Sequence, residues 1–348
     1  MEKIRLGRTG MMVSRLGFGS IPIQRASDDE ALAVINKCME LGITYIDTAN
    51  GYTTSEERIG RAISGRRDEV IIATKSHAQT REGIESDLKL SLKRFGVEYI
   101  DLYQFHNIRS TDALERVLEP NGVMDVILEA KKAGIVRHIG ASSHSLDTAK
   151  EIVKSDRFET IQFPFNFITC EAADELLPLT REHDVGFIAM KPLAGGRLDN
   201  ATLAFKYLFQ FPDVVPIPGI YKTHEIEEIV QIMEQSLAMT VAEQREMEQL
   251  KQELGTRFCR RCDYCQPCPE GILISDVLVF PSLLKIQTPE RLFMGTFSKP
   301  MEKAANCAEC GECEEKCPYH LPIREMVAEY VKQYQAEKKK FLEQTASK

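Results

Sequence analysis

The sequence predicts an α/β chain in which a (β/α)8 TIM barrel over residues 1–240 is followed by a small helical domain over residues 241–348. Three observations support this prediction. Short β-rich runs alternate with amphipathic stretches throughout the first part of the chain. Three consecutive β-rich runs end in polar residues. Eight of the ten cysteines fall in the last ninety residues, in two tight clusters.

The predicted strands are short and apolar, and amphipathic segments separate them. Eight such strands over roughly 240 residues are typical of a closed parallel barrel. The first helical segment places Ala31, Val34 and Ile35 on one face, and Gly42 lies just past its end. The predicted strands are residues 15–19, 43–47, 70–75, 100–106, 136–141, 160–164, 185–190 and 214–218, and the predicted helices include residues 29–41, 81–95, 113–133 and 146–154.

A doubly wound sheet is the competing fold. It would need fewer strands and a Gly-x-Gly-x-x-Gly turn after the first one. Here Gly17 and Gly19 are followed by Ser20, Ile21 and Pro22, so that turn is absent. The sequence therefore favours the barrel.

The pattern changes near Thr240. Residues 241–254 are expected to form one charged helix, and Gly255 marks its end. The first cysteine run follows, then a linker over residues 272–305, the second cysteine run and a final helix from Pro322 towards Lys340.

Composition limits the cellular context and the partners. The net charge of −8 argues against nucleic acid or an anionic membrane surface as the main partner. Residues 1–20 lack the apolar core of a signal peptide, and no apolar run approaches the ~20 residues that span a bilayer. Cysteines clustered this densely without a secretion signal indicate metal ligands in a reducing compartment. We therefore expect a cytoplasmic protein.

Four polar residues are expected at one end of the barrel. Asp47, Lys75 and His106 end the second, third and fourth predicted strands, and Tyr52 follows the second. The carboxyl ends of barrel strands form a single face, where active sites lie. A lysine ammonium lowers the pKa of a nearby tyrosine, an aspartate compensates the buried lysine, and a histidine orients a carbonyl oxygen. Tyr52 would then deliver a proton as hydride reaches the carbon.

On these residues the sequence resembles the aldo-keto reductase family. The resemblance covers about residues 1–240. It implies NAD(P)H-dependent carbonyl reduction, with Tyr52 as the acid, Lys75 and Asp47 as its tuning pair and His106 as the group that orients the substrate. The matching blocks are residues 6–10, residues 13–19, Asp47-Thr48-Ala49 with Tyr52, Ser55-Glu56, Gly60, Ala73-Thr74-Lys75, Asp101-Leu102-Tyr103 with His106, and Ile139-Gly140-Ala141-Ser142.

The resemblance also implies a nicotinamide site and an adenosine-phosphate site. The nicotinamide site would use Ser142, Ser143 and Gln162, with Phe165 as an aromatic shelf, although many members have asparagine where Ser143 stands. Lys222 is either a phosphate ligand or a solvent-facing charge, and nearby Glu225 would repel a 2′-phosphate. NADP and NAD both stay open. The remaining expected cofactor residues are Pro192, Leu193, Gly195, Gly219, Lys222 and Thr223.

The second cysteine run matches the Cys-x2-Cys-x2-Cys-x3-Cys-Pro pattern of bacterial-type ferredoxins, and the first run is one residue shorter. The tripled spacing favours two [4Fe–4S] clusters over zinc, for which two cysteines in each run would be surplus. The ferredoxin resemblance implies that the last cysteine of each run serves the other cluster. The runs are Cys259, Cys262, Cys265 and Cys268, and Cys307, Cys310, Cys313 and Cys317.

The sequence thus predicts an NAD(P)H-dependent oxidoreductase that reduces a small aldehyde or ketone to an alcohol. The appended iron–sulfur module would pass electrons to a redox protein partner, sense redox state or stabilise the fold. A redox-sensing protein that binds nucleotide with little turnover is the alternative, because Ser143 and the adenosine loop depart from the family pattern. A zinc-stabilised reductase is a third hypothesis.

Overall fold

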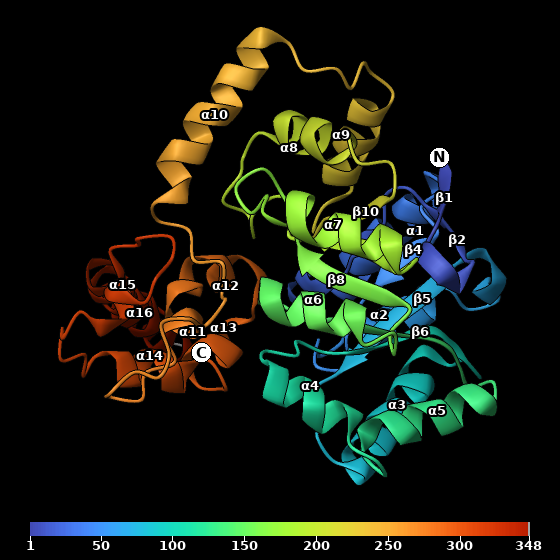
Figure 1. Ribbon diagram of the computed structural model, residues 1–348, viewed down its shortest axis with the longest axis horizontal. Coiled ribbons are helices and arrows are strands. Elements are labelled where there is room, and N and C mark those ends of the chain that lie inside the picture. Colours follow the sequence, from blue (N-terminus) through green and yellow to red (C-terminus); the bar gives the residue numbers. More distant parts are fainter. Residues whose placement is uncertain (347–348) are drawn as a thin grey trace. The chain divides into compact units, whose positions relative to one another are not determined.

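A computed structural model describes residues 1–346 of the chain (Figure 1). The chain folds into two compact units, Met1–Thr240 and a second unit that begins at Val241. The last two residues of the second predicted domain, 347 and 348, lie outside the described residues.

An eight-stranded parallel sheet forms the centre of the first unit, and its strands follow the order of the chain. Each strand pairs with the next one along the sequence, as in a barrel with short right-handed crossovers. The strands are β3 (Phe18–Gly19), β4 (Tyr45–Asp47), β5 (Ile71–Ser76), β6 (Ile100–Phe105), β7 (Val136–Ser142), β8 (Thr160–Pro164), β9 (Gly186–Met190) and β10 (Val214–Ile217).

The sheet closes where β3 meets the end of β10. The amide of Gly19 donates to the carbonyl of Pro218 over 2.8 Å, and Gly19 bridges Gly219 in parallel. A Cβ atom on Gly19 would lie 2.7 Å from the carbonyl oxygen of Ile217, so glycine is required for this approach. The predicted (β/α)8 TIM barrel is confirmed.

Helices surround the strands of this unit (Figure 1). Ser27 and Glu30 form a capping box at the start of the first helix. Gly96 ends the third helix in the left-handed conformation. The helices are α1 (Asp28–Glu40), α2 (Ser55–Ala62), α3 (Arg81–Phe95), α4 (Thr111–Leu118), α5 (Val123–Lys132), α6 (Leu146–Lys154), α7 (Ala172–Glu182), α8 (Ala201–Leu208) and α9 (Thr223–Met233).

The expectation of one helix over residues 113–133 is wrong, because the chain breaks between α4 and α5. Glu119 precedes Pro120 and has an extended backbone, as proline imposes on the residue before it. Asn121 then adopts a positive φ of 58°. These two residues interrupt the helix, and a second helix begins at Val123.

Side chains fill the barrel interior in layers. In the deeper part of the barrel, one buried apolar cluster contains Tyr45, Ala73, Leu102 and Ile188. A short antiparallel hairpin of β1 (Lys3–Arg5) and β2 (Met12–Ser14) contributes Leu6 and Val13 to this cluster, and the sequence analysis did not predict the hairpin. Because side chains alternate along a strand, the residues two positions later face the same interior one layer higher.

The second unit is helical and has its own core. The predicted linker over residues 272–305 is not a plain linker, because it forms four short helices. Val277 and Met301 from these helices pack with Met326 of the last helix. The helices are α10 (Val241–Gly255), α11 (Ile274–Leu278), α12 (Phe280–Ile286), α13 (Pro289–Phe293), α14 (Ser298–Ala304), α15 (Glu312–Glu315) and α16 (Ile323–Ala346).

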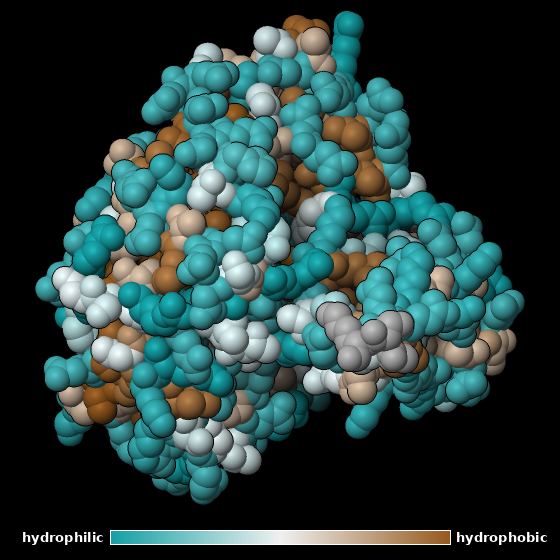
Figure 2. Space-filling view, turned by 180° about the vertical axis from the view of Figure 1, so that it is seen from behind, coloured by the Kyte–Doolittle hydropathy of each residue, from teal (hydrophilic) through white to brown (hydrophobic). Residues whose placement is uncertain are grey.

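The face shown in Figure 2 is largely polar. Figure 2 shows mostly hydrophilic residues on the face that it presents, with apolar residues in small groups. Among the helices of residues 1–346, none combines the length and the apolar character that a bilayer span requires.

Candidate active site and cysteine centres

The polar residues expected at the barrel mouth lie one layer above the apolar cluster. Asp47 is two residues beyond Tyr45 on β4, and Lys75 is two residues beyond Ala73 on β5, so both point into the barrel. His106 directly follows β6. The strand register therefore brings these groups to the carboxyl ends of adjacent strands.

Lys75 and Asp47 form a buried ion pair. The ammonium nitrogen Nζ of Lys75 lies 2.6 Å from Oδ1 of Asp47, and only 1% and 4% of the two side chains are exposed. Lys75 also donates to the carbonyl of Thr48 over 2.7 Å. The amide of Gln104 donates to the other carboxylate oxygen of Asp47 over 3.3 Å. Gln162 from β8 hydrogen-bonds the same carboxyl group.

Burial dominates the electrostatics of this pair. It raises the pKa of Asp47, whereas the charge of Lys75 and the hydrogen bonds from Lys75, Gln104 and Gln162 act in the opposite direction. Burial also lowers the pKa of Lys75, against the attraction of Asp47. Each partner therefore needs the other in order to stay charged inside the barrel.

Tyr52 lies beside both Lys75 and His106. The Lys75 ammonium is 5.7 Å from the centre of the Tyr52 ring. The rings of Tyr52 and His106 meet edge to face, with centroids 5.9 Å apart and planes at 79°. The phenol thus has a cation and an imidazole as neighbours, which is the arrangement that proton donation to a carbonyl oxygen requires.

A chain of buried hydroxyl groups fixes the turn that carries Tyr52. Thr48 donates to Ser55 over 2.9 Å, Ser55 donates to Ser20 over 2.8 Å, and Ser20 donates to the carbonyl of Asp47 over 2.8 Å. These hydroxyls tie the end of β4 to the start of α2. The amide of Ser55 also donates to the carbonyl of Tyr52 over 2.8 Å, which holds the turn closed.

His77 is a further mouth residue that the sequence analysis missed. Its ring stacks on that of His106 with a centroid distance of 3.8 Å and an interplanar angle of 13°. His77 directly follows β5, two positions after Lys75. The same alternation that places Lys75 could have identified His77.

Ser142 and Ser143 stabilise the loop that carries His106. The hydroxyl of Ser142 accepts the amide of Asn107 over 2.8 Å. The hydroxyl of Ser143 donates to the carbonyl of Ile108 over 2.7 Å and accepts the amide of Ser145 over 3.2 Å. Both serines are buried. In this structure their hydroxyls position the loop that carries His106.

The structure does not bring Phe165 to the mouth as an aromatic shelf. Phe165 is fully buried and packs on Phe187, Tyr207 and Phe211 at centroid distances of 5.0–5.7 Å. Gln162 faces the barrel interior, so residues an odd number of positions away face the surrounding helices. The alternation of β8 therefore directs Phe165 outward.

The loop after β9 contains the expected cofactor residues Pro192, Leu193 and Gly195. Its backbone turns tightly, with positive φ at Lys191, Ala194, Gly195 and Gly196. The amide of Gly196 donates to the carbonyl of Leu193 over 2.8 Å, so part of the loop's hydrogen bonding is internal.

At the start of α9, Lys222 is already paired. Its ammonium lies 2.6 Å from Oε1 of Glu30 on α1. Hydrogen bonds from Lys222 and Ser27 lower the pKa of Glu30 to about 2. The amides of Tyr221 and Lys222 both donate to Glu225, at 2.6 Å and 2.9 Å. The neighbouring Gly219 and Thr223 stand where β10 leads into α9.

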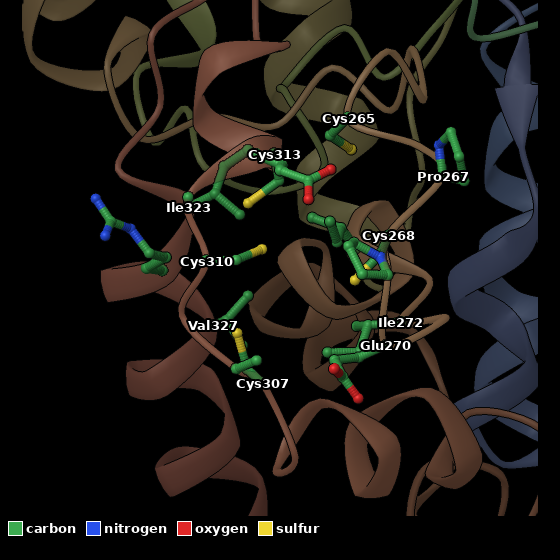
Figure 3. A pocket seen from close by; sticks show the side chains of 16 residues that line it. Cys265, Pro267, Cys268, Glu270, Ile272, Cys307, Cys310, Cys313, Ile323 and Val327 are labelled. Carbon is green, nitrogen blue, oxygen red and sulfur yellow. The ribbon is translucent and has the colours of Figure 1, made fainter.

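In the second unit, the eight clustered cysteines line two hollows. We name the first the Cys259 cradle; it is lined by Cys259, Cys262, Cys265 and Cys317. The second, the Cys310 cradle, is lined by Cys268, Cys307, Cys310 and Cys313 (Figure 3), and Cys265 and Ile323 border both. The last cysteine of each run thus lies with the first three of the other, as the ferredoxin pattern implies. Cys268 lines the Cys310 cradle although the spacing before it is one residue short.

The two cysteine loops share one backbone pattern. Arg261 and Asp263 flank Cys262 with φ of 63° at each position. Glu309 and Gly311 flank Cys310 with φ of 53° and 84°. In each run, residues with a left-handed backbone flank the second cysteine and bend the loop around its hollow.

The residues fit iron–sulfur clusters. Each cradle offers at least four thiols around a common space, and each iron of a cubane cluster takes one thiolate. Within residues 1–346, no three His, Cys, Asp or Glu side chains converge closely enough to chelate a single ion. Burial raises the pKa of Cys265 to about 12 and that of Cys313 to about 11, so metal binding must displace their protons.

A comparison with family models decides which family the barrel represents. The aldo/keto reductase family model matches residues 15–203, which is more than half of the chain. The chain belongs to the aldo/keto reductase family. A second family model, that of the 4Fe-4S dicluster domain, matches residues 258–322 of this aldo/keto reductase. The match spans all eight clustered cysteines.

Individual relatives of this aldo/keto reductase are oxidoreductases. The uncharacterized oxidoreductase YqkF of Bacillus subtilis is 32% identical over 58% of this chain and 68% of the relative. The NADH-specific methylglyoxal reductase of Escherichia coli is 28% identical over 57% of this chain and 69% of the relative. Among solved structures, an aldo-keto reductase from Bacillus halodurans in its holo form is similar, with a TM-score of 0.62 and 26% identity, covering 72% of this chain and 96% of that chain.

Proposed function

We propose that this aldo/keto reductase reduces a small aldehyde or ketone to an alcohol with a nicotinamide nucleotide. The observation that carries the proposal is the position of Tyr52, which lies beside both Lys75 of the Lys75–Asp47 pair and His106. The name of the Escherichia coli relative supports both a carbonyl substrate and a nicotinamide cofactor.

In this mechanism the protein's own side chains orient the carbonyl group and transfer the proton. His106 donates a hydrogen bond to the carbonyl oxygen and orients it. NADH or NADPH, when bound, supplies the hydride to the carbonyl carbon. Tyr52 passes its hydroxyl proton to the oxygen, and the Lys75 ammonium stabilises the resulting phenolate. Asp47 holds Lys75 in position for this step.

We further propose that the second unit holds two [4Fe–4S] clusters. Cys259, Cys262, Cys265 and Cys317 would bind one, and Cys268, Cys307, Cys310 and Cys313 the other. The sorting of these side chains into two cradles supports the assignment. Bound clusters supply one-electron redox chemistry, so a redox protein partner is consistent with this unit.

A redox-sensing protein with little turnover is the second candidate. Ser143 hydrogen-bonds the carbonyl of Ile108, and Phe165 packs on Phe211. Two residues that were expected to contact the nicotinamide are therefore engaged with other groups, which favours this candidate. Such a protein would bind the nucleotide without rapid oxidation of it.

One experiment separates these candidates. The protein is purified without oxygen, and oxidation of NADH and NADPH is followed with a panel of aldehydes. Tyr52→Phe should lower kcat by about a hundredfold to ten-thousandfold while nucleotide binding, measured by fluorescence, stays intact. Tyr99→Phe is the control, because Tyr99 precedes β6 at the opposite end of the barrel. An unchanged rate in Tyr52→Phe would sink the catalytic assignment, and tight nucleotide binding without turnover in the wild type would favour the sensor.

A further inference from the structure

In addition to the buried hydroxyl groups described above, helix α3 holds the turn that carries Tyr52. The point of attachment is Asn50, two positions before Tyr52. The backbone amide of Asn50 donates to the carbonyl of Lys75 over 2.9 Å. Its side-chain amide donates to the carbonyl of Asp87 and to the hydroxyl of Ser91 on α3, both over 3.2 Å. The position of Asn50 is therefore set jointly by β5 and by α3.

Arg94, near the end of α3, completes this attachment. Nη1 of Arg94 donates to the backbone carbonyl of Asn50 over 2.9 Å and to Oε2 of Glu56 over 3.1 Å. The other carboxylate oxygen of Glu56 accepts the hydroxyl of Thr74 over 2.7 Å, and Thr74 directly precedes Lys75 on β5. A single guanidinium thus links the turn to α2 and, through Glu56, to β5.

The Arg94–Glu56 pair is shielded from solvent. Only 1% of the Glu56 side chain and 21% of the Arg94 side chain are exposed. A hydrogen-bonded ion pair holds its geometry better when water does not compete for its donors and acceptors. Glu57, by contrast, is 60% exposed and lies 3.9 Å from Nε of Arg94, so it contributes little. The buried carboxylate of Glu56 therefore fixes the direction in which the guanidinium points.

The close approach of α2 and α3 that this pair needs depends on Gly60. A Cβ atom on Gly60 would lie 2.6 Å from the carbonyl oxygens of both Arg94 and Phe95. A larger residue at this position would therefore push the end of α3 away from α2. Because glycine stands here, the backbone of Arg94 stays close to α2, and its side chain can reach both Glu56 and Asn50.

We propose that Arg94 is a positioning residue for carbonyl reduction, and that the Arg94–Glu56 pair holds the turn so that the Tyr52 hydroxyl stays in place for proton transfer. Arg94 acts through the backbone of Asn50 and not through contact with the substrate. Proton transfer needs the phenol within hydrogen-bonding distance of the carbonyl oxygen, so a small displacement of the turn slows this step. The assignment rests on the proposed carbonyl reduction and adds a residue from a surrounding helix to it.

Variants of the pair separate positioning from the burial of charge. Arg94→Gln breaks the contact with Asn50 and leaves the Glu56 carboxylate without its partner, so the protein should be less stable. Arg94→Gln combined with Glu56→Gln removes both charges, so the urea midpoint of this double variant should lie closer to that of the wild type. Both proteins should nevertheless lose about tenfold to a hundredfold in kcat for the aldehydes, with KM changed by less than about twofold.

A matched control and a spectroscopic measurement complete the test. Lys93→Gln removes a positive charge from an exposed position beside Arg94 and should leave kcat unchanged. Fluorine resonance spectra of protein labelled with meta-fluorotyrosine do not depend on turnover. Of the signals from the ten tyrosines, the one missing in Tyr52→Phe belongs to Tyr52. This signal should shift or broaden in Arg94→Gln and in the double variant, whereas Lys93→Gln should leave it in place.

The two kinds of measurement have distinct outcomes. Wild-type kcat in the double variant, or an unchanged Tyr52 signal in Arg94→Gln, would overturn the proposal. If no aldehyde is reduced but the Tyr52 signal still depends on Arg94, carbonyl reduction fails while the positioning of Tyr52 by Arg94 stands.

Discussion

The ammonium of Lys222 lies 2.6 Å from a carboxylate oxygen of Glu30, so the start of α9 is tied to the first turn of α1. Lys222 is the residue expected to contact an adenosine 2′-phosphate. In the described structure, a phosphate at this position has to compete with Glu30 for the same cation.

Glu30→Gln should shift cofactor preference towards NADPH. The substitution removes the competing charge, whereas glutamine can keep the capping box with Ser27. We expect the ratio of NADPH to NADH affinity to rise about fivefold, as for a partly exposed ion pair. Fluorescence titration with both nucleotides measures the ratio. Glu40→Gln, which removes an exposed charge at the end of α1, is the control. An unchanged ratio in Glu30→Gln would show that Lys222 does not contact the phosphate.

The Lys75–Asp47 pair should show strong thermodynamic coupling. Lys75→Met leaves a buried carboxylate without its counter-charge and should lower the free energy of unfolding by about 3–5 kcal/mol. Asp47→Asn should also destabilise the barrel, but the double variant should lose less than the sum of the two single losses. Urea unfolding followed by circular dichroism measures the three values. Strict additivity would argue against a direct interaction between the pair.

The exchange of cysteines between the two runs can be tested by iron content. Cys268→Ala and Cys310→Ala should damage the same cluster, so the double variant should retain about half of the wild-type iron. Cys259→Ala with Cys268→Ala should damage both clusters and lose nearly all of it. Iron and sulfide are measured after anaerobic purification. The reverse pattern would show that each run binds its own cluster.

Cluster loss in air should begin at the Cys310 cradle. Of the eight clustered cysteines, all within the described residues, only Cys310 is exposed. Oxygen and chelators therefore reach this side first, because oxidation follows exposure. Timed exposure followed by electron paramagnetic resonance should show one signal decaying before the other. Cys310→Ala should remove the faster phase, and its persistence in that variant would contradict the assignment.

Acid should weaken the barrel through Glu159. Partial burial alone would raise the pKa of Glu159, but hydrogen bonds from His138, Lys131 and the amide of Ile139 bring the pKa to about 2, below its ordinary value of 4.5. The carboxylate therefore stabilises the fold above the ordinary value, and this contribution is lost as the pH falls towards 2. Glu159→Gln should lower the free energy of unfolding by about 2 kcal/mol at neutral pH. The difference in free energy of unfolding between the variant and the wild type should shrink as the pH falls. A difference that does not change with pH would rule out this linkage.

The barrel and the polar strand ends of the candidate site were predictable because both depend on local order along the chain. An apolar run followed by a polar residue marks where a strand ends, and parallel pairing then brings those ends together. The positions of Asp47, Lys75 and His106 could be predicted without knowledge of packing between distant parts of the chain. Tyr52 required only a short turn after β4.

The cofactor contacts were harder to predict because they depend on which way a side chain points. Phe165 is directed outward by the alternation that turns Gln162 inward. Ser143 is used by the backbone of the neighbouring loop, and no feature of its own segment indicates this. The short helices of residues 272–305 escaped prediction because helices of five to seven residues show too little periodicity.

Ile323, at the start of α16, borders both cradles. Together with Cys265, the branched side chain of Ile323 thus separates the two cradles. Loss of the cluster from one cradle removes the packing on one side of Ile323, and this loosens the other cradle. The cysteine unit should therefore mature as a whole, and its half-filled form should be short-lived.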